Sequence, residues 1–217
     1  DIIACSRKKN EDFENLISNI SKKNKNKITP VYFDLLKENE IKEAVEKINS
    51  ISNNIDIIVN NAGINQVSLF QMTSLEKIKE VFDINFFSHL SFTQKLMKSM
   101  IKNKQGSIIN IASNAAEECD AGRVAYASSK SAFIAFTKVL AKELGNFGIR
   151  VNSIAPGLTK TKMIEKDISA KIIDDAIKKV ALKRSAEPEE IAKVAVFLAS
   201  DLSSYVTGEA IFVTGGY

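Results

Sequence analysis

IDIIVNNAG (residues 55–63) is a short run of β-branched residues, and five similar runs alternate with longer stretches of helical period along the chain. This alternation predicts an α/β protein with a mostly parallel sheet. Most of the runs are continuously apolar, as is typical of strands that helices cover on both faces. The predicted strands are residues 1–6, 27–34, 55–63, 106–113, 149–157 and 209–216. The predicted helices are residues 10–25, 38–52, 74–102, 124–147, 169–180 and 188–200.

The composition indicates one globular domain over residues 1–217, because 45% of the residues are apolar and 26% are charged. The net charge is only +4, and the lysines face acids in the predicted helices instead of forming a basic block, which argues against a nucleic-acid partner. No run approaches the roughly 18 to 20 apolar residues that span a bilayer, and the first residues lack the order of a signal peptide. We therefore expect a cytoplasmic protein with no membrane partner. Cys5 and Cys119 are too few for a disulfide framework or a cysteine-rich metal site, so we expect free thiols and no metal.

Glycine is absent from the first 62 residues, since all nine glycines lie at or after Gly63. A doubly wound nucleotide-binding fold normally opens with a strand, a glycine-rich turn that approaches the pyrophosphate, and a helix N-terminus that favours negative charge. Here DIIACSR (1–7) is followed by a helical stretch and then by VYFD (31–34), the usual content of the second and third strands. We therefore expect either a protein that starts about 30 residues earlier, the size of one βα unit, or a chain that binds a dinucleotide poorly.

The segment YASSK (126–130) places a tyrosine and a lysine four residues apart at the start of a predicted helix, so both side chains project from one face. Tyrosine ordinarily has a pKa of about 10, but a neighbouring ammonium favours the phenolate. Tyr126 then suits general acid or base chemistry without a histidine. Ser113, at the carboxyl end of a predicted strand, lies where ligands bind in open α/β sheets and suits holding a carbonyl oxygen. Taken alone, Tyr126 and Lys130 also fit a solvated pair at a helix start, and Ser113 fits a serine that satisfies local backbone.

Six short motifs occur in order along the chain, and the ordered set is far more specific than any single piece. They are NNAG (60–63), DIN ending in Asn85, IINIAS ending in Ser113, YASSK (126–130), IRVNSIAPG (149–157) and VTGGY (213–217). Together they resemble the short-chain dehydrogenase/reductase family, and most closely its branch similar to 3-oxoacyl-carrier-protein reductases. The resemblance implies a Rossmann-type fold, a doubly wound parallel sheet in three α/β/α layers, here lacking the first strand, the glycine-rich loop and the first helix.

The resemblance also implies a catalytic tetrad. Tyr126 would donate the proton in the reductive direction, and Lys130 would favour its phenolate and hold the nicotinamide ribose. Ser113 would orient the substrate carbonyl, and Asn85 would bind a water that links Lys130 to solvent. Taken alone, Asn85 also fits a buried structural amide. The hydride would come from a nicotinamide cofactor, because no side chain can donate one. The only histidine, His89, is expected to be a packing or surface residue.

The same resemblance indicates which residues hold the cofactor. Ser6 and Arg7, followed by two lysines, stand where an acid would bind the ribose 2′-hydroxyl of NAD. Basic groups there suit a 2′-phosphate, so we favour NADP(H) over NAD(H), with a solvated helix entrance as the alternative interpretation. The other predicted contacts are Asp34 at the adenine edge, Asn61, Ala62 and Gly63 beside the adenosine ribose, Pro156, Gly157 and Thr159 along the pyrophosphate and carboxamide, Thr161 near the carboxamide, and Tyr126 with Lys130 at the nicotinamide end.

The predicted reaction is reduction of a ketone to a secondary alcohol, or its reverse, with 3-oxoacyl thioesters favoured as substrates. A sugar or polyol dehydrogenase of the same family is one alternative, and a non-catalytic dinucleotide-binding protein or inactive fragment is another. Residues 157–185 would form a lid over the substrate, with Met163 at the pocket, and an exposed pair of helices is the alternative interpretation of this segment.

Two kinds of protein partner follow from the resemblance. Lys104 stands where the reductase branch has a basic residue that meets an acidic carrier protein, but Phe147 replaces a second such residue. Family members usually pair the helices corresponding to residues 74–102 and 124–147 across two-fold axes, so we expect a homo-oligomer, either a tetramer or a dimer. The loop beside the site adds acidic residues that weaken the case for an acidic carrier, namely Glu117, Glu118 and Asp120.

Overall fold

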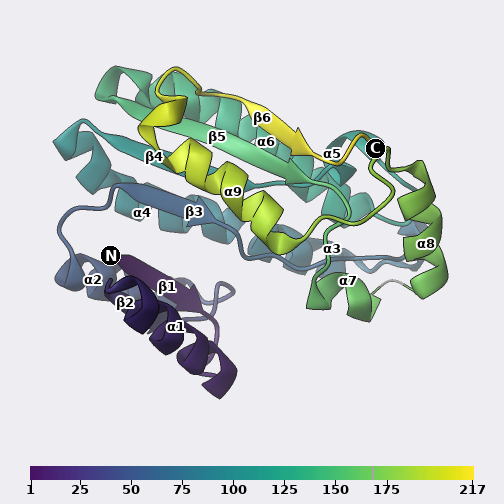
Figure 1. Cartoon of the computed structure of the whole chain (residues 1–217), viewed down its shortest axis with the longest axis horizontal. Helices are drawn as coiled ribbons and strands as arrows, with labels where there is room; N and C mark the ends of the chain where they lie inside the picture. Colours follow the sequence, from purple (N-terminus) through teal and green to yellow (C-terminus); the bar gives the residue numbers. More distant parts are fainter. Residues whose placement is uncertain (168) are drawn as a thin grey trace.

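Strands and helices alternate along the chain in the computed structural model, which describes residues 1–167 and 169–217 (Figure 1). Every strand pair is parallel, so the predicted α/β class is confirmed. The strands are β1 (Ile2–Ser6), β2 (Ile28–Tyr32), β3 (Ile57–Asn60), β4 (Gly106–Ile111), β5 (Ile149–Pro156) and β6 (Ala210–Val213). The α-helices are α1 (Glu11–Asn24), α2 (Glu38–Ile51), α3 (Leu75–Phe82), α4 (Ser88–Asn103), α5 (Ala115–Glu118), α6 (Val124–Leu144), α7 (Lys162–Asp167), α8 (Ala170–Lys179) and α9 (Pro188–Ala199).

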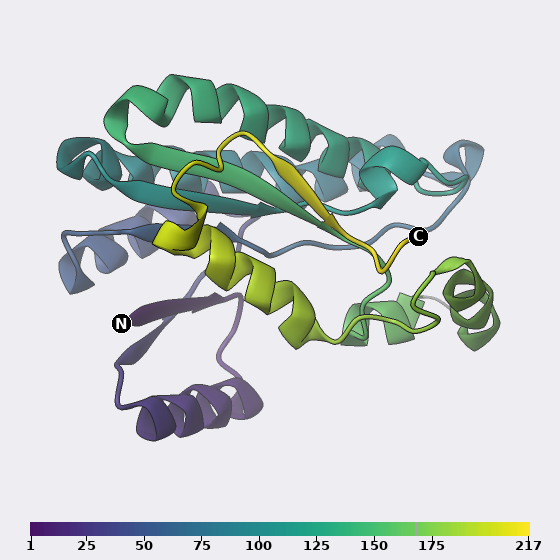
Figure 2. The same cartoon turned by 45° about the horizontal axis from the view of Figure 1, so that its top comes forward.

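The strands form two sheets. β1 pairs with β2, while β3, β4, β5 and β6 pair in that order. In the larger sheet Ile108 of β4 lies opposite both Ile58 of β3 and Val151 of β5. Figure 2 shows β1 and β2 set apart from β3, and the described residues contain no hydrogen-bonded pairing between β1 and β3. The sheet is therefore interrupted at the place where the resemblance puts a central strand.

Helices cover both faces of the larger sheet (Figure 2), with α4 and α6 on one face and α9 on the other. Ile108 belongs to the cluster that includes Leu96 of α4 and Leu140 of α6, whereas its neighbour Ile109 packs with Ile154 and Leu198 of α9. Successive residues of a strand point to opposite faces, so one apolar run supplies both halves of the core. No helix in the described part of the chain is both long and apolar enough to cross a membrane.

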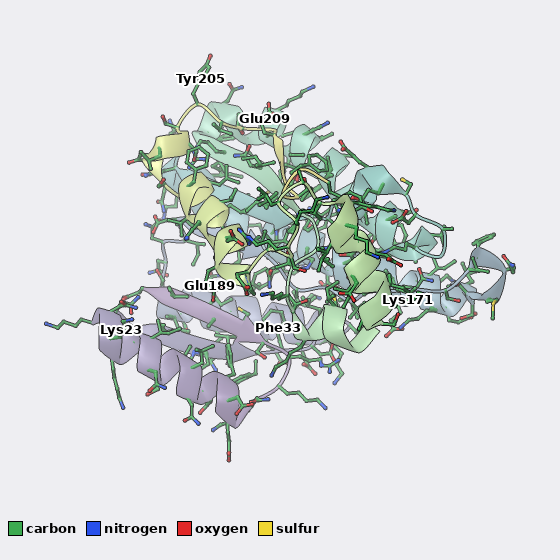
Figure 3. The ribbon with its side chains drawn as sticks, turned by 45° about the vertical axis from the view of Figure 1, so that its right-hand side comes forward. Lys23, Phe33, Lys171, Glu189, Tyr205 and Glu209 are labelled. Carbon is green, nitrogen blue, oxygen red and sulfur yellow. The ribbon has the colours of Figure 1, made fainter. Side chains whose placement is uncertain are left out.

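The N-terminal part of the chain, from β1 to α2, packs against α4 through α2 and the residues that follow β2. Phe33, which follows β2 and is labelled in Figure 3, stacks on Phe92 of α4 with ring centroids 5.4 Å apart. Ile41 and Ile48 of α2 are buried in the same cluster as Leu96 of α4. This contact fixes the position of the segment that follows β2, which contains Asp34.

Local sequence signals explain several helix ends. Asn10 caps α1 by accepting hydrogen bonds from the amides of Asp12 and Phe13, and Ser74 caps α3 by accepting from the amide of Lys77. Pro188 occupies the first turn of α9, where its missing N–H needs no partner. The C-terminal stretch of α6 ends in a short 3₁₀ turn, Gly145–Phe147, instead of continuing as α-helix through residue 147.

The helix predicted over residues 74–102 is broken into two. A π-helical segment, Asp83–Phe87, separates α3 from α4 and contains Asn85. The apolar residues keep a spacing of three and four through this break, which is why the sequence pattern does not reveal it. Single π turns inside helices are frequently found at functional sites. The short helix α5 was also not predicted.

Candidate active site

The polar residues predicted to form the site lie at the carboxyl ends of three neighbouring strands. Residues 61–63 follow β3, Ser113 follows β4, and Pro156 ends β5. α6, which carries Tyr126 and Lys130, packs against β5. In an open α/β sheet this edge is where ligands bind.

Lys130 is a buried lysine with one direct partner. Its Nζ donates a hydrogen bond of 2.7 Å to the carbonyl oxygen of Ile111 and lies 5.9 Å from the centroid of the Tyr126 ring. Burial lowers the pKa of Lys130 to about 8, because the ammonium loses its hydration. The lysine is therefore still charged at neutral pH, and its charge sits beside the aromatic ring of Tyr126.

Gly63 allows Asn85 and Lys130 to approach each other. A Cβ atom at Gly63 would lie 3.1 Å from Asn85 Oδ1 and 3.6 Å from Lys130 Nζ. A methyl group here would make ordinary contact with Lys130 and would require Asn85 to shift by a few tenths of an ångström. The glycine of NNAG thus has a steric role in the site.

Asn85 is fully buried and holds the backbone after Gly63. Its Oδ1 accepts a hydrogen bond of 2.8 Å from the amide of Ile64, and its Nδ2 donates to the Ile64 carbonyl at 3.0 Å. Nδ2 also donates to Ser129 Oγ at 3.2 Å, and Ser129 Oγ donates to the carbonyl oxygen of Tyr126 at 2.8 Å. A chain of hydrogen bonds therefore links the π segment, the turn after β3 and the start of α6. The water-binding role of Asn85 stays a prediction.

Ser113 is buried at the start of the turn that leads into α5. Its Oγ accepts a hydrogen bond of 3.2 Å from the amide of Ala115. Ser131 of α6 donates to the carbonyl oxygen of Ala116 at 3.0 Å, which fastens this turn to the helix that carries Tyr126. Ser113 therefore sits on a segment whose position relative to α6 is fixed, and its role toward a substrate stays a prediction.

Two residues of the site were missed by the sequence patterns. The guanidinium carbon of Arg123 lies 4.7 Å from the centroid of the Tyr126 ring, and Arg123 Nη2 donates a hydrogen bond of 3.0 Å to Asn65 Oδ1. A basic residue three positions before Tyr126, at the N-cap of α6, is the signal that points to Arg123. Nothing in the sequence singles out Asn65.

His89 is buried, so of its two predicted placements the packing one holds. Its ring stacks on Phe133 with centroids 5.4 Å apart, and Nε2 lies 2.7 Å from the carbonyl oxygen of Ala62. Burial lowers the pKa of His89 to about 4. A neutral imidazole that donates from Nε2 fits this contact and holds the turn after β3 in place.

Sequence comparisons decide the family. The sequence model of the family described as Enoyl-(Acyl carrier protein) reductase matches residues 2–217. The 3-oxoacyl-[acyl-carrier-protein] reductase FabG of Thermotoga maritima is 40% identical over 190 residues, which are 88% of this chain and 77% of the relative. The protein of the same name from Aquifex aeolicus is 41% identical over 186 residues, 86% of this chain and 75% of the relative. The chain belongs to the short-chain dehydrogenase/reductase family.

Solved structures agree with this assignment. The structure of a candidate gluconate dehydrogenase from Agrobacterium tumefaciens matches this short-chain dehydrogenase/reductase with a TM-score of 0.92 at 28% identity, covering 99% of this chain and 84% of that one. The structure of a candidate betaketoacyl-ACP reductase matches with a TM-score of 0.84 at 31% identity, covering 100% of this chain and 86% of that one. The protein is therefore an oxidoreductase that acts on a CH–OH group with a nicotinamide dinucleotide.

The polar and exposed groups predicted to hold the two ends of such a dinucleotide are present in this short-chain dehydrogenase/reductase. Lys130 Nζ, predicted at the nicotinamide end, lies 5.9 Å from the centroid of the Tyr126 ring and faces Gly63. Asn61 and Ala62, predicted beside the adenosine ribose, are exposed. At the adenosine end, Arg7 is exposed, and Asp34 Oδ1 accepts a hydrogen bond of 3.0 Å from the amide of Leu36. Ser6 Oγ donates to the carbonyl oxygen of Lys8 at 3.4 Å.

The N-terminus of α1 is capped by the protein's own side chain and is acidic. The helix that follows β1 is α1, but the Asn10 side chain occupies its first amides and acids fill its first turn. A helix N-terminus in that state does not favour a pyrophosphate.

The predicted lid, residues 157–185, is fastened at its base. Ala186 donates its amide hydrogen to the carbonyl oxygen of Leu158, and the Lys160 amide donates to the carbonyl oxygen of Ala186, both at 2.9 Å. Thr159 Oγ1 donates to the carbonyl oxygen of Gly157 at 3.0 Å, and Thr161 Oγ1 accepts from the amide of Ile164. Residue 168 lies outside the described residues. α7 and α8 form the rest of the segment, and Met163 is partly exposed on α7.

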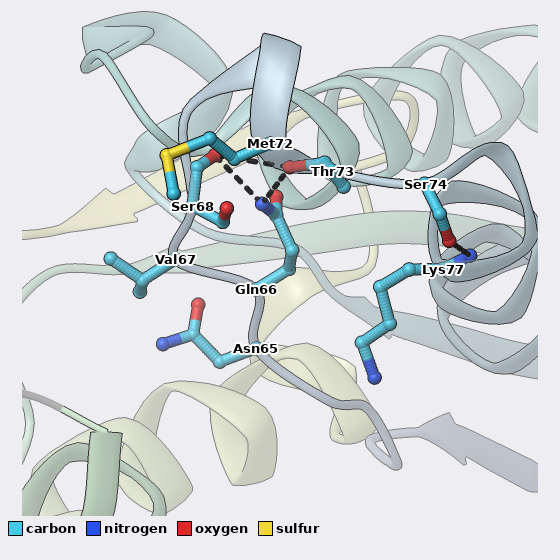
Figure 4. Close-up of a pocket in the computed structure, with 8 residues that line it drawn as sticks. All are labelled: Asn65, Gln66, Val67, Ser68, Met72, Thr73, Ser74 and Lys77. Carbon is cyan, nitrogen blue, oxygen red and sulfur yellow. Dashed lines mark hydrogen bonds between the residues drawn. The ribbon is translucent and has the colours of Figure 1, made fainter.

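A cavity of about 440 Å³ lies along the segment between β3 and α3 (Figure 4). Asn65 and Gln66 line it on one side and Lys77 on another. Gln66 Nε2 donates to the carbonyl oxygen of Ser68 and to Thr73 Oγ1, which holds the loop in its bent course. Arg123 is hydrogen-bonded to Asn65, one of the residues that line this cavity.

Proposed function

We propose that this protein reduces a ketone to a secondary alcohol with NADP(H), and that 3-oxoacyl thioesters are its favoured substrates. The observation that carries the proposal is the position of the charged and buried Lys130, which lies beside the Tyr126 ring and, together with Asn85, faces Gly63 at the carboxyl edge of the sheet. The FabG relatives, at 40% and 41% identity, support the substrate class.

In the proposed mechanism the Tyr126 hydroxyl donates a proton to the carbonyl oxygen of the substrate. Lys130 places a positive charge beside the ring and favours the phenolate that this transfer leaves behind. Ser113 donates a second hydrogen bond to the same oxygen and fixes its position. The nicotinamide supplies the hydride when it is bound. Asn85 keeps the turn after β3 in place through Ile64, and a water at Asn85 restores the proton by way of Lys130.

The preference for NADP(H) rests on the basic residues after β1. Arg7 and Lys8 are exposed and form no ion pair with the described residues, whereas Lys9 lies 3.7 Å from Glu14. A 2′-phosphate would gain charge-assisted hydrogen bonds from the free guanidinium. Asp34, Pro156, Gly157, Thr159 and Thr161 complete the proposed cofactor contacts, with residues 157–185 as the lid over the substrate.

Three further proposals concern a carrier protein, the pairing of subunits and an alternative function. Lys104, which ends α4 in a left-handed conformation, would meet an acidic carrier protein. The exposed side chains of Phe87 and Val139 suit pairing of the helices around residues 74–102 and 124–147 between subunits. A sugar or polyol dehydrogenase is the alternative function, because the candidate gluconate dehydrogenase matches the fold with a TM-score of 0.92.

The test is the reduction of an acetoacetyl thioester with NADPH by the protein and by its Tyr126→Phe variant. Loss of the hydroxyl removes the proton donor, so we expect turnover to fall by roughly a thousandfold or more, within the range typical of a general acid. Calorimetry should show that the affinity for NADPH stays within about twofold. Tyr205→Phe is the matched control, since Tyr205 is fully exposed far from the site (Figure 3) and its loss should change neither quantity. Unchanged turnover in Tyr126→Phe would contradict the mechanism.

A further inference from the structure

Arg123 is held in one place against the proposed proton donor. It stands three residues before Tyr126, with its guanidinium carbon 4.7 Å from the ring centroid, a distance typical of a cation–π contact. Asn65 Oδ1 accepts from Arg123 Nη2, and the Ser68 amide donates to the carbonyl oxygen of Gly122 at 2.8 Å. Two hydrogen bonds thus join the loop after Gly63 to the loop before α6, directly beside Tyr126.

The guanidinium offers more N–H groups than the protein uses. Arginine carries five such donors, and Asn65 accepts from one nitrogen. No carboxylate among the described residues forms an ion pair with Arg123. Arg123 Nε and Asn65 Nδ2 are both buried without a hydrogen-bond partner. Buried donors are almost always paired in folded proteins, so this pair of residues lacks an oxygen acceptor.

A second oxygen on the substrate would supply that acceptor. In a 3-oxoacyl thioester the thioester carbonyl is separated from the ketone by a single carbon atom. When the ketone oxygen accepts from the Tyr126 hydroxyl, the thioester oxygen therefore remains close to the Tyr126 ring, where the guanidinium lies. Hydrogen bonds from a charged donor are about twice as strong as neutral ones. A ketone without a second carbonyl group has no oxygen that could accept a hydrogen bond from the guanidinium.

We propose that Arg123 determines specificity by donating hydrogen bonds to the thioester carbonyl oxygen of a 3-oxoacyl substrate. Asn65 is a positioning residue that holds the guanidinium and offers Nδ2 as a further donor. The inference rests on the proposed function, because it assigns the second half of the substrate to the same site. If Arg123 acts in this way, selectivity for 1,3-dicarbonyl compounds depends on the loop after Gly63 and the loop before α6, both outside the catalytic tetrad.

The test compares two substrates in the protein and in Arg123→Met. One substrate is an acetoacetyl thioester, and the other is cyclohexanone, a ketone with one carbonyl group. We expect kcat/KM for the thioester to fall roughly 10- to 100-fold, the loss expected for hydrogen bonds to a charged group, mostly through KM. For cyclohexanone we expect a change of less than about twofold, because no bond to Arg123 is lost. Lys142→Met, an exposed lysine on the same helix, is the control and should leave both values unchanged.

An equal loss for both substrates would mean that Arg123 acts through the Tyr126 ring, and it would overturn the proposal. Greater efficiency with free acetoacetate than with the thioester would mean that the guanidinium binds a carboxylate, and it would also overturn the proposal. Calorimetric binding of the acetoacetyl thioester gives a readout without turnover, and Kd should rise about 10- to 100-fold in Arg123→Met. Were the unmodified protein to reduce neither substrate, the proposed function would fail, while the binding comparison would still decide the role of Arg123.

Discussion

β4 and β1 are both short apolar strands, yet one is buried and the other is not. Five of the six residues of β4 are buried, whereas β1 has none, and Ile2 is 49% exposed. β4 pairs with β3 and β5 and has α9 and α6 against it, while β1 pairs with β2 alone. The burial of a strand in a parallel sheet therefore depends on its neighbours as much as on its own composition.

The proposed functions divide between these two regions. Lys130, Asn85, Gly63 and Arg123 belong to the region of β3–β6 and α6, where hydrogen bonds and packing fix each of them. Ser6 and Arg7 follow β1, where Arg7 is exposed. We infer that the first region carries the carbonyl chemistry and the second carries the choice of cofactor. Substitutions in one region should therefore spare the property of the other.

The largest contrast is expected from matched truncations in the two sheets. Ile154→Ala removes a fully buried side chain of β5 that packs on Leu198, and it should lower the free energy of unfolding by about 2–5 kcal/mol. Ile2→Ala makes the same change in β1, where the side chain is half-exposed. This variant should lower the free energy of unfolding by less than about 1 kcal/mol. Urea unfolding of both variants measures the difference. Equal losses would show that β1 is packed as tightly as β5.

The second prediction concerns the pH dependence of stability that Lys130 causes. The pKa of Lys130 is about 8 in the folded protein, below the ordinary value for lysine of about 10.4. Between these values the unfolded chain binds more protons, so the free energy of unfolding should rise with pH. The destabilisation caused by the buried charge reaches its full size only below about pH 8. At about 1.4 kcal/mol per unit, the rise attributable to Lys130 is on the order of 3 kcal/mol.

Lys130→Met isolates this effect, because methionine keeps the apolar stem and never carries a proton. The stability of the variant relative to the unmodified protein should be highest near neutral pH and should decline as pH approaches 10.4. Urea unfolding at several pH values gives the comparison. A stability difference that does not change with pH would contradict the assignment of a lowered pKa to Lys130.

Much of the packed region could be predicted from the sequence. The i, i+4 spacing of Tyr126 and Lys130 places both on one side of α6, and the position of Ser113 at a strand end follows from the apolar run before it. The π segment at Asn85 could not be predicted, because the apolar spacing of the helix passes through it unchanged. Arg123 and Asn65 meet only after folding, since a loop and a helix start 58 residues apart form their bond. The exposure of Ile2 could not be predicted from the apolar run of β1, because it depends on which strands lie beside β1.

The most direct test of the whole account is a calorimetric titration of the protein with NADPH and then with NADH. We expect NADPH to bind about tenfold more tightly, the gain from one or two charge-assisted hydrogen bonds to the 2′-phosphate. In Arg7→Ala the two affinities should converge, and turnover at saturating NADPH should be unchanged because the β3–β6 region is untouched. Equal or tighter binding of NADH by the unmodified protein would contradict the assignment of cofactor choice to the residues after β1. No binding of either dinucleotide would contradict the claim that the described residues hold both of its ends.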